Sequence, residues 1–512
     1  MSKMRGRILI PLPNTGSMGR KRNNFYMRSI FLLALCIFGL LQYHNFNYLD
    51  SRDTVLGDAV TNDSDDAILA MVPAPLHKYL TPHSRNHSGT ATTGTLGVLG
   101  APLLLNSSSS GAATATTISF DVYHPPNISE IKRQIVKYND MQLVLNEDTF
   151  GPLQNDSVII VVQVHTRITY LRHLIVSLAQ AQDITKVLLV FSHDYYDEDI
   201  NDLVQQIDFC KVLQIFYPYS IQTHPHEYPG VDPNDCQRNI KKDQAMISNC
   251  NNALYPDLYG HYREAKFTQT KHHWIWKANR VFNELEVTRY HTGLVLFLEE
   301  DHYVAEDFLY LLAMMQKRTK DLCPQCNVLS LGTYLKTFNY YTYHSKLHAR
   351  VRLVKIDSQS IINDYRKVEV MPWVSSKHNM GFAFNRTTWT NIRKCARHFC
   401  TYDDYNWDWS LQHVSQQCLQ RKLHAMIVKG PRVFHIGECG VHHKNKNCES
   451  NQVISKVQHV LRIARTSHQL FPRSLTLTVP SLSKKTKLRK GNGGWGDLRD
   501  HELCLNMTLA TR

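Results

Sequence analysis

The stretch SVIIVVQV, Ser157–Val164, decides the fold class of this chain. It is an unbroken apolar run rich in β-branched residues, which is typical of a strand buried on both faces. RITYLRHLIVSLAQA follows it, with apolar residues at helical spacing. A second strand, KVLLVFSHD (Lys186–Asp194), a helix, DEDINDLVQQI, and a third strand, CKVLQIFYP, come next. This β-α-β-α-β order predicts an α/β fold with parallel strands and right-handed crossovers.

The second half of the chain continues the pattern in a more mixed form. TKHHWIWKANRVFNEL is predicted to be a helix that leads into a strand, LVLFLEEDHYV (Leu294–Val304). DFLYLLAMMQK is predicted to be the helix after it. Further strands are expected at NVLSLG, GFAFNR and AMIVKGPRVFHI.

The N-terminal part of the chain has the pattern of a membrane anchor. Residues 1–28 are basic and contain no acid, and the next fifteen, SIFLLALCIFGLLQY, carry no charge. We expect residues 29–46 to form an uncleaved signal-anchor, with 1–28 in the cytosol and the rest in the lumen. A cleaved signal peptide is the alternative, but no A-x-A-like site follows. The short span suits the thin membranes of the early secretory pathway.

The segment 47–130 is rich in Ser, Thr, Asn, Gly and Ala, and we expect it to be a flexible stem. Residues 131–512 are expected to form the lumenal catalytic domain. The chain has a formal net charge of +14, but a lumenal protein meets no nucleic acid. The charge therefore indicates a solvated surface with some attraction for anionic ligands such as sugar nucleotides.

Lumenal placement predicts N-glycosylation and oxidised cysteines. Asparagines that begin an Asn-x-Ser/Thr sequon are Asn62, Asn86, Asn106, Asn127, Asn155, Asn385 and Asn506. Eleven of the twelve cysteines lie beyond the anchor, so at least one is free or joins two chains of an oligomer.

Three adjacent acids, Glu299, Glu300 and Asp301, end the strand LVLFLEEDHYV. Neighbouring carboxylates repel one another and raise one another's pKa values, and a divalent cation removes that cost. Capping of the next helix is the alternative interpretation, but a cap needs one acceptor. Glu306 and Asp307 are better placed to supply it. We therefore favour metal or ligand binding.

Carboxylate oxygens with one imidazole suit Mn²⁺ or Mg²⁺. The imidazole candidate is His435, although a lone His after a strand is commonly structural. Polar residues also follow two other strands, in QVHTR (Gln163–Arg167) and in SHD, which ends at Asp194. Ligands of open α/β sheets bind beyond such carboxyl ends. Because no Gly-rich phosphate loop is present, a nucleotide diphosphate would need a metal and cationic side chains.

Two cysteine motifs have competing interpretations. Cys439 and Cys448 flank two histidines and allow a zinc site, while Cys323 and Cys326 form a CxxC motif that allows zinc or redox chemistry. In an oxidising lumen we favour disulfides for both.

The segment TYDDYNWDWSLQ, residues 401–412, combines three acids with four aromatic residues. Dense Trp and Tyr suit a sugar ring, which has apolar C–H faces and hydroxyl edges. Asp408 begins a helical stripe, where the helix dipole would hold its carboxylate ionised. That position suits a helix-terminal acid and a general base equally well, and the residues alone leave both open.

These motifs together resemble one known family. EED at a strand end, YDDYNWDW, VFHIGECGVHH and NGGWGDLRDHELC (Asn492–Cys504) look like the alpha-1,6-mannosyl-glycoprotein 2-beta-N-acetylglucosaminyltransferase family, also called N-acetylglucosaminyltransferase II. The resemblance runs from about Ile131 to Cys504, and the stem shows none of it. YDDYNWDW and GGWGDLRDHE are the specific motifs; EED alone would indicate only a metal-dependent transferase that uses a sugar nucleotide.

The resemblance implies a GT-A-type glycosyltransferase fold and a Golgi type II membrane protein. It implies inverting transfer of GlcNAc from UDP-GlcNAc to O2 of the α1,6-linked mannose of the N-glycan core, with Mn²⁺ as cofactor. Another inverting GlcNAc-transferase that acts on a different arm, and a catalytically silent lumenal lectin, are the alternatives. The segment LKTFNYYTYH, residues 335–344, has no counterpart that we can match to acceptor contacts.

Carried over by motif, the resemblance also implies roles for individual residues. Asp408 would be the catalytic base, and Asp301 and His435 would hold the metal. The residues implied to line the donor site are Gln163, Val164, His165, Thr166, Arg167, Asp194, Gln269, Thr270, Lys271, His272, His273, Glu299 and Glu300. Those implied near the acceptor are Tyr405, Asn406 and Trp407. The implied disulfides are Cys236–Cys250, Cys323–Cys326, Cys395–Cys418, Cys400–Cys504 and Cys439–Cys448, which leaves Cys210 free.

Overall fold

A computed structural model of the protein describes residues 69–81, 127–333, 364–437, 450–478 and 490–509. All of them belong to one unit that begins at Leu69. The expected cytosolic tail and anchor, residues 1–46, lie outside the described residues. Among the described residues, no helix has both the length and the apolar character that a membrane span requires.

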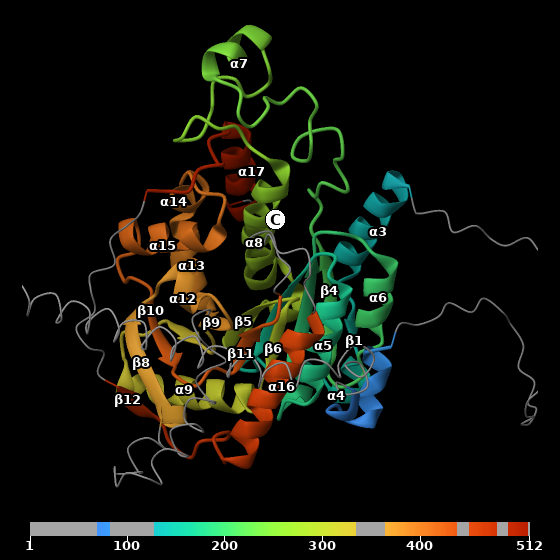
Figure 1. The fold of residues 1–512 in the computed structure, drawn as a ribbon, viewed down its shortest axis with the longest axis vertical. Helices are drawn as coiled ribbons and strands as arrows, with labels where there is room; N and C mark the ends of the chain where they lie inside the picture. Colours follow the sequence, from blue (N-terminus) through green and yellow to red (C-terminus); the bar gives the residue numbers. More distant parts are fainter. Residues whose placement is uncertain (1–68, 82–126, 334–363, 438–449, 479–489, 510–512) are drawn as a thin grey trace, which may run out of the picture. The chain divides into compact units, whose positions relative to one another are not determined.

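Ten strands of the described residues form one mixed sheet, in the order β1-β4-β3-β2-β5-β9-β7-β10-β8-β12 (Figure 1). Their bounds are β1 Val144–Leu145, β2 Ile159–Val164, β3 Leu188–His193, β4 Lys211–Phe216, β5 Leu294–Glu299, β7 Val328–Ser330, β8 Lys367–Pro372, β9 Phe382–Asn385, β10 His424–Val428 and β12 Thr476–Thr478. The neighbours β4, β3, β2 and β5 are parallel, as the β-α-β-α-β pattern predicts. Beyond β5 the sheet is mixed: the pairs β5–β9, β9–β7 and β10–β8 are antiparallel, and the pairs β7–β10 and β8–β12 are parallel.

A small second sheet pairs β6 (His302–Val304) with β11 (Val433–His435) in antiparallel register, with His302 opposite His435. It begins directly after the acidic end of β5. The pairing therefore brings the neighbourhood of Asp301 to that of His435 although the two residues are far apart in the chain.

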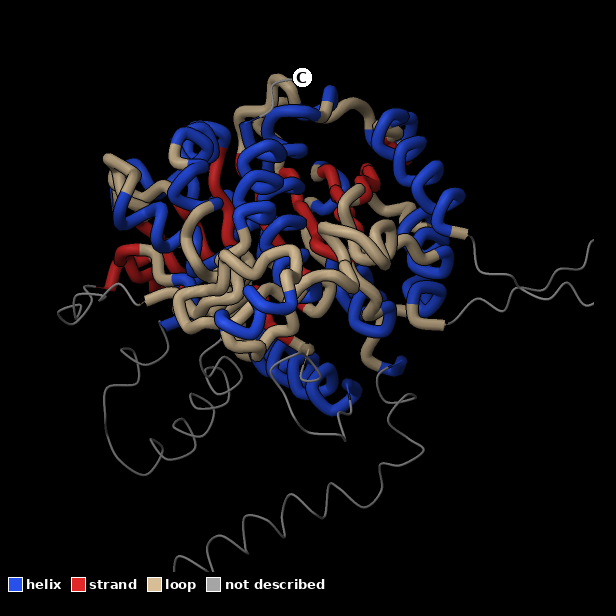
Figure 2. Tube along the Cα trace, turned by 90° about the horizontal axis from the view of Figure 1, so that it is seen from above, coloured by secondary structure: helices blue, strands red, loops and turns tan. Residues whose placement is uncertain are grey.

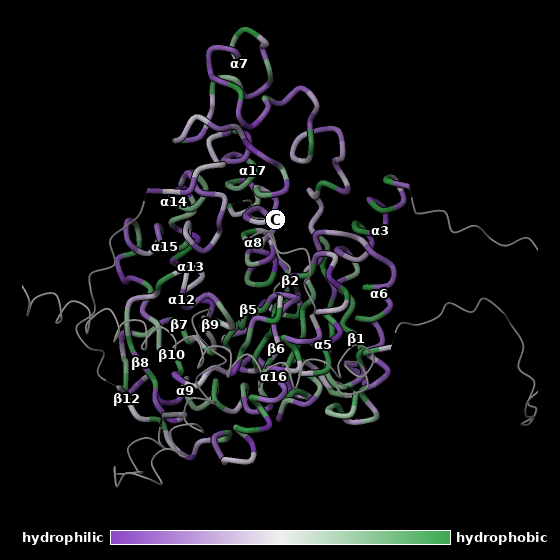
Figure 3. Tube along the Cα trace, viewed as in Figure 1, coloured by the Kyte–Doolittle hydropathy of each residue, from purple (hydrophilic) through white to green (hydrophobic). Residues whose placement is uncertain are grey.

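Helices cover both faces of the large sheet, because its central strands are apolar on both sides. Ile160 and Val162 face one apolar core together with α5 and α9, and Ile159 and Val161 face a second core together with α8 and α15. Figure 2 shows the strands between helices on either side, and in Figure 3 the central strands are the most hydrophobic part of the trace. The helices of the first face are α5 Ile168–Ala179, α6 Glu198–Gln205 and α9 Phe308–Leu322. Those of the second are α8 Ala265–Asn279, α13 Arg386–Lys394, α14 Ala396–Cys400, α15 Trp407–Gln417 and α17 Leu498–Leu509.

The other helical elements are shorter or more peripheral. They are η1 Ala74–Tyr79, α3 Ile128–Met141, α4 Glu147–Phe150, η2 Ile184–Lys186, α7 Lys242–Ser248, the π-helical turn η3 Arg280–Glu284, η4 Glu286–Thr288, η5 Asp364–Arg366, α12 Ser375–His378 and α16 Ser450–Thr466. The α7 segment projects at the top of Figure 1 and carries much hydrophilic sequence (Figure 3).

Residues 69–81 differ from the flexible stem that their position in 47–130 predicts. Tyr79 is fully buried and packs edge-on against Phe209. Its hydroxyl donates a 2.7 Å hydrogen bond to Asp208 Oδ1, and Arg172 donates to the Tyr79 carbonyl. Residues 69–81 therefore pack against the domain although the sequence around them has low complexity. Tyr79, their large aromatic residue, completes the core beside α5 and α6.

The catalytic domain also begins slightly before the expected Ile131. Helix α3 begins at Ile128, because Asn127 caps it by accepting a 2.8 Å hydrogen bond from the Glu130 amide. An Asn that begins a sequon thus also serves as the cap of the helix, and its exposed position leaves the sequon at the surface.

Candidate active site

The three polar strand ends that the sequence singles out meet at one edge of the sheet. Gln163 lies opposite Glu299 in the β2–β5 pair, and Val164 lies opposite His193, the residue before Asp194, in the β2–β3 pair. This is the edge at which ligands of open α/β sheets bind.

The acidic end of β5 is held by Arg167, which precedes α5. Arg167 Nε donates a 2.7 Å hydrogen bond to Glu300 Oε1, and Arg167 Nη1 lies 2.7 Å from Asp301 Oδ2. Glu300 also accepts the His165 amide at 2.8 Å. Burial raises the pKa of Glu300, although these contacts with Arg167 and the His165 amide act to lower it. Burial also opposes ionisation of Asp301, yet His435 and Arg167 hold the pKa of Asp301 below its ordinary value.

Capping of α9 does not account for these acids, nor does it use the residues expected for it. Asp307 stands at the N-cap position, but its carboxylate accepts hydrogen bonds of 2.8 Å from Arg432 Nε and from the Phe471 amide. Glu306 pairs with Arg465 at 2.6 Å. The expectation that these two acids serve the helix was therefore wrong, because both are taken by arginines from later in the chain.

Asp301 and His435 come together as a metal site would require. His435 Nε2 lies 3.1 Å from Asp301 Oδ2, and Asp301 Oδ1 is buried with no hydrogen-bond partner among the described residues. Gly437 leaves the space beside this carboxylate open, since a Cβ there would lie 2.1 Å from Asp301 Oδ2. A carboxylate with an unused oxygen beside an imidazole is a donor set that suits Mn²⁺.

Glu299 and His302 are the other groups near Asp301. One ligand atom from each of the three residues lies within 4.8 Å of the others. His302 is nevertheless a poor ligand, because its Nδ1 accepts the Glu299 amide at 3.2 Å. A neutral ring with an accepting Nδ1 carries its proton on Nε2, so neither nitrogen offers a lone pair to a cation. His435 is therefore the better candidate for an imidazole ligand, and Glu299, which the resemblance places at the donor site, is a candidate for a further oxygen ligand.

One face of α8 completes the edge on the side of β3. Asp194 accepts hydrogen bonds of 2.6 Å from His165 Nδ1 and 3.0 Å from Gln269 Nε2, and His273 Nδ1 lies 3.4 Å from it. Burial disfavours the ionised form of Asp194, but these partners hold its pKa well below the ordinary value. His165 remains about half exposed, so this cluster borders solvent. Thr166, next to it, is exposed as well.

The motif QTKHH, residues 269–273, divides between opposite sides of α8. Gln269 and His273, four residues apart, face Asp194. Thr270 is exposed, and Lys271 and His272 turn toward the C-terminal part of the chain. The structure therefore brings two of these five predicted donor residues to the sheet edge and places the other three elsewhere.

Lys277 is a functional candidate that the sequence analysis missed. It lies one helical turn beyond His273, is fully buried, and donates a hydrogen bond to Gln163 Oε1. Burial lowers the pKa of Lys277, and the charge of Glu299 opposes that shift. The i, i+4, i+8 spacing of Gln269, His273 and Lys277 is the signal that would have found it.

Asp408 lies in the first turn of α15, as the helical stripe predicts. Its Oδ1 accepts the Trp409 amide at 2.9 Å, and its Oδ2 accepts Asn379 Nδ2 at 3.1 Å. Burial raises the pKa of Asp408 to about 7, and the charges of Asp404 and Glu299 act in the same direction. The expectation that the helix dipole holds this acid ionised was wrong, because burial raises the pKa of Asp408 more than the hydrogen bond from the Trp409 amide lowers it. A carboxylate with a pKa near neutrality is suited to general-base chemistry.

The three predicted acceptor residues have different surroundings. Trp407 is buried and stacks on Trp274 with ring centroids 4.7 Å apart, so its ring belongs to the core. Asn406 precedes α15 and donates to Asp404 Oδ1 from both its amide and its side chain. Tyr405 is half-buried against Phe267. Residues 335–344, whose acceptor contacts the sequence left open, lie outside the described residues.

Four of the five implied disulfides are present: Cys236–Cys250, Cys323–Cys326, Cys395–Cys418 and Cys400–Cys504. Cys439 and Cys448 lie outside the described residues, and Cys210 is a buried free thiol as expected. The sequon asparagines Asn127, Asn155 and Asn506 are exposed and Asn385 is half-exposed, while Asn62, Asn86 and Asn106 lie outside the described residues.

Comparison with known proteins decides the family. The family model of N-acetylglucosaminyltransferase II matches residues 132–355 and 349–504. The chain belongs to the N-acetylglucosaminyltransferase II family. Its relatives include the alpha-1,6-mannosyl-glycoprotein 2-beta-N-acetylglucosaminyltransferase of Rattus norvegicus, 43% identical over 370 residues that cover 72% of this chain and 78% of the rat protein. The Homo sapiens protein of the same name is 43% identical over 374 residues, with 72% and 77% covered. That of Arabidopsis thaliana is 32% identical over 373 residues, with 72% and 78% covered.

The match to the N-acetylglucosaminyltransferase II family model covers all of the candidate site. The matched residues include the strand ends, α8, Asp301, Asp408 and His435.

Proposed function

We propose that this protein transfers GlcNAc from UDP-GlcNAc to O2 of the α1,6-linked mannose of the N-glycan core, with formation of a β1,2 linkage. Family membership supports this substrate pair, and the observation that carries the chemistry is Asp408. It is a carboxylate in a first helical turn, with its pKa raised by burial to about 7, and it is close enough to the acidic end of β5 to respond to the charge of Glu299.

The donor would lie along the carboxyl ends of β2, β3 and β5 in a GT-A-type arrangement. His165, Asp194 and Gln269 form a hydrogen-bonded cluster that borders solvent and suits the polar edge of a uracil or ribose. Arg167 adds a guanidinium beside Asp301, where the negative diphosphate would bind.

Asp301 and His435, with Glu299 beside them, would hold Mn²⁺ or Mg²⁺. The buried and unused Oδ1 of Asp301 supports this role. A divalent cation at that place would neutralise the charge of the departing diphosphate.

In the reaction, Asp408 takes the proton from the mannose O2 hydroxyl. O2 then forms a bond to the anomeric carbon from the face opposite the diphosphate. The bond from that carbon to the phosphate oxygen breaks, and UDP departs with the electron pair. This single displacement converts the α configuration of the donor into the β configuration of the product without an enzyme nucleophile.

A transfer assay with UDP-GlcNAc, Mn²⁺ and defined acceptors tests the proposal. Acceptors with and without GlcNAc on the α1,3 arm separate it from transfer to another arm, and UDP release in the presence of acceptor separates it from a silent lectin. Asp408→Asn should bind UDP normally and lose turnover by at least ~10²-fold, the usual contribution of a general base. Asp199→Asn, at an exposed acid in the first turn of α6, is the matched control and should retain turnover. Near-normal turnover of Asp408→Asn would exclude Asp408 as the base.

The same proposal places the protein in the Golgi membrane as a single-pass type II protein, anchored by residues 29–46. The four disulfides and the exposed sequons support an oxidising, glycosylating compartment. Protease protection of the catalytic domain in sealed Golgi vesicles, with digestion after detergent is added, tests this orientation.

A further inference from the structure

Lys271 is a buried lysine on the side of α8 that faces away from Asp194. Its Nζ donates hydrogen bonds of 3.1 Å to the Tyr402 carbonyl and 2.9 Å to the Asp404 carbonyl. The ammonium also lies over the ring of Trp495, 4.0 Å from the ring centroid. Lys271 is fully buried, so the contacts replace water around a formal charge.

These contacts are unusual for a buried ammonium, because they are made to neutral groups. Two carbonyls and an aromatic face take up the three donors of the ammonium. Burial lowers the pKa of Lys271 to about 7, and the charges of Asp404 and Asp403 oppose that shift. A buried charge is costly unless its hydrogen bonds are satisfied. The position of the two carbonyls is therefore tightly coupled to that of Lys271.

The two carbonyls belong to the turn that leads into α15. Asp404 orders the turn further by accepting hydrogen bonds of 2.9 Å from Asn406 and from Asn492. Ser410, in the first turns of α15, donates to the Asp404 carbonyl at 3.3 Å. Asp408 stands between Asn406 and Ser410 in the chain. The turn held by Lys271 therefore determines where α15 begins and where the carboxylate of Asp408 lies.

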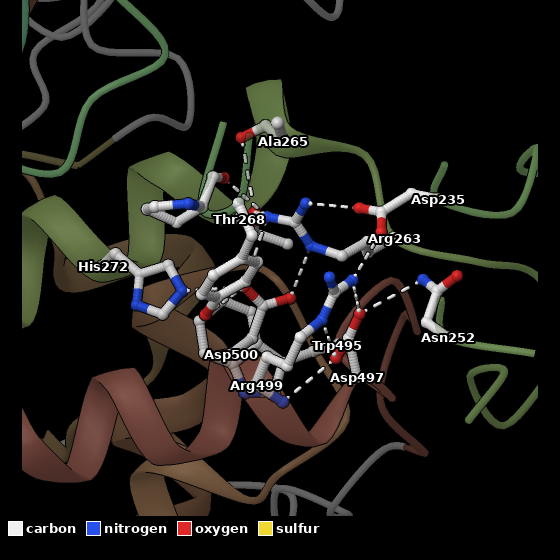
Figure 4. A network of polar contacts seen from close by, with 12 residues as sticks. Asp235, Asn252, Arg263, Ala265, Thr268, His272, Trp495, Asp497, Arg499 and Asp500 are labelled. Carbon is white, nitrogen blue, oxygen red and sulfur yellow. Dashed lines mark hydrogen bonds and ion pairs between the residues drawn. The ribbon is translucent and has the colours of Figure 1, made fainter. Parts of the chain in front are cut away.

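The C-terminal motif GGWGDLRDHE braces the same side of α8. Trp495 donates from Nε1 to the Cys400 carbonyl at 2.7 Å and from its amide to Asp403 Oδ1 at 3.0 Å. His272, next to Lys271, lies 3.0 Å from Asp500, which Arg263 also binds at 2.9 Å (Figure 4). The helix therefore carries the donor-side residues on one side and the support of the base on the other.

We propose that Lys271 is a positioning residue that holds the turn before α15, and thereby Asp408, at a fixed place relative to a donor bound on the opposite side of α8. It acts through the turn rather than by touching the donor. The inference rests on the proposed function, because it takes Asp408 as the base.

The test separates donor binding from turnover. Lys271→Met keeps the length of the side chain and removes the charge and the donors. We expect UDP to bind in the presence of Mn²⁺ with the wild-type Kd, while kcat falls by roughly 10–10²-fold, the scale of a small misplacement of a catalytic group. Gln269→Ala, on the donor side, should instead weaken UDP binding. Lys186→Met, at an exposed lysine outside the candidate site, should change neither the Kd for UDP nor kcat.

Two outcomes would overturn the inference: weaker UDP binding by Lys271→Met with kcat retained, which would make Lys271 a donor ligand, or no change in either quantity. If Lys271→Met does not fold, Lys271→Gln, which keeps an N–H donor, takes its place with the same expected split. Asp408→Asn, measured alongside, distinguishes failure of the proposed base from failure of the positioning role. Full turnover of Asp408→Asn removes the proposed base itself, whereas loss there with full turnover of Lys271→Met removes only the positioning role.

Discussion

Asn379 Nδ2 donates a 3.1 Å hydrogen bond to Asp408 Oδ2 from the end of α12, and so fixes the carboxylate from outside its own helix. The other oxygen is held by the Trp409 amide. Hydrogen bonds donated to a carboxylate favour its ionised form. The Trp409 amide lowers the pKa of Asp408 in this way, whereas burial raises it and prevails. The balance leaves Asp408 with a pKa at which small changes in its surroundings alter its protonation at physiological pH.

The pH dependence of turnover should therefore report Asp408. With a pKa of about 7, the carboxylate is protonated and inactive as a base below that pH and becomes ionised above it. We expect kcat/KM to rise with pH through about 7 and to level off above it. An acidic limb near the ordinary Asp value of about 4 would contradict this.

Removal of the hydrogen bond from Asn379 to Asp408 should shift the acidic limb of the kcat/KM profile. Asn379→Ala deletes a donor that favours the ionised carboxylate, so the pKa of Asp408 should rise and the acidic limb of kcat/KM should shift to higher pH. The pH profile of the variant measured against wild type gives the result. A limb that stays in place or moves to lower pH would show that this hydrogen bond does not stabilise the ionised form.

Gly437 should support metal binding, because only a residue without a side chain fits beside Asp301. In Gly437→Ala the new methyl group would lie 2.1 Å from Asp301 Oδ2, so the carboxylate must move. We expect Mn²⁺ binding, measured by calorimetry without donor, to weaken by about 10–100-fold, as when a supporting contact of a ligand is lost. Gly491→Ala is equally tight against the Asp403 carbonyl, at 2.1 Å, and should leave the Mn²⁺ affinity unchanged. Equal affinities for the three proteins would remove Asp301 from the metal site.

The disulfide Cys400–Cys504 should contribute more stability than Cys323–Cys326. The first closes a loop with a sequence separation of 104 residues and the second one of 3. Replacement of both Cys400 and Cys504 by Ala should lower the free energy of unfolding by about 2–5 kcal/mol, with a smaller loss for the short loop. Denaturant unfolding of the two double variants compares them. The expected order follows because a disulfide restricts the unfolded chain more when it closes a longer loop. A larger loss for the short loop would contradict this explanation.

Tyr79 should stabilise the catalytic domain although it lies in the segment expected to be a stem. Tyr79→Ala empties a fully buried site and should cost about 3–5 kcal/mol of the free energy of unfolding. Tyr79→Phe removes only the hydroxyl that binds Asp208 and should cost about 1 kcal/mol. Urea unfolding measures both losses, and an unchanged midpoint for Tyr79→Ala would show that the segment does not dock in solution.

The sequence predicts the parallel half of the sheet well, because β2, β3 and β4 are mostly apolar segments whose burial on both faces leaves few alternatives. It misses β8, whose residues are mostly half-buried at the far side of the sheet, although the alternation KVEV at its start is typical of such a strand. Residues 69–81 escape prediction for a related reason: one aromatic residue, Tyr79, supplies the docking, and its partners lie more than a hundred residues away.

At the site, the strand ends are predictable because parallel topology brings them together. The division of QTKHH is not visible in a contiguous motif, since neighbouring residues of a helix point about 100° apart. Trp407 shows a similar limit: an aromatic-rich segment suits a sugar, but this ring stacks on Trp274 in the core. The pKa of Asp408 depends on how deeply α15 packs, which the sequence does not reveal.

The antiparallel pairing of β6 with β11 has a consequence for how the chain tolerates insertions and deletions. The register sets His302 opposite His435, one residue beyond Asp301. Because strand residues alternate between faces, one residue added to or lost from either short strand would turn Asp301 or His435 to the wrong side. Related proteins should therefore keep both three-residue strands, and the two-residue connection from β5 that carries Asp301, at a fixed length.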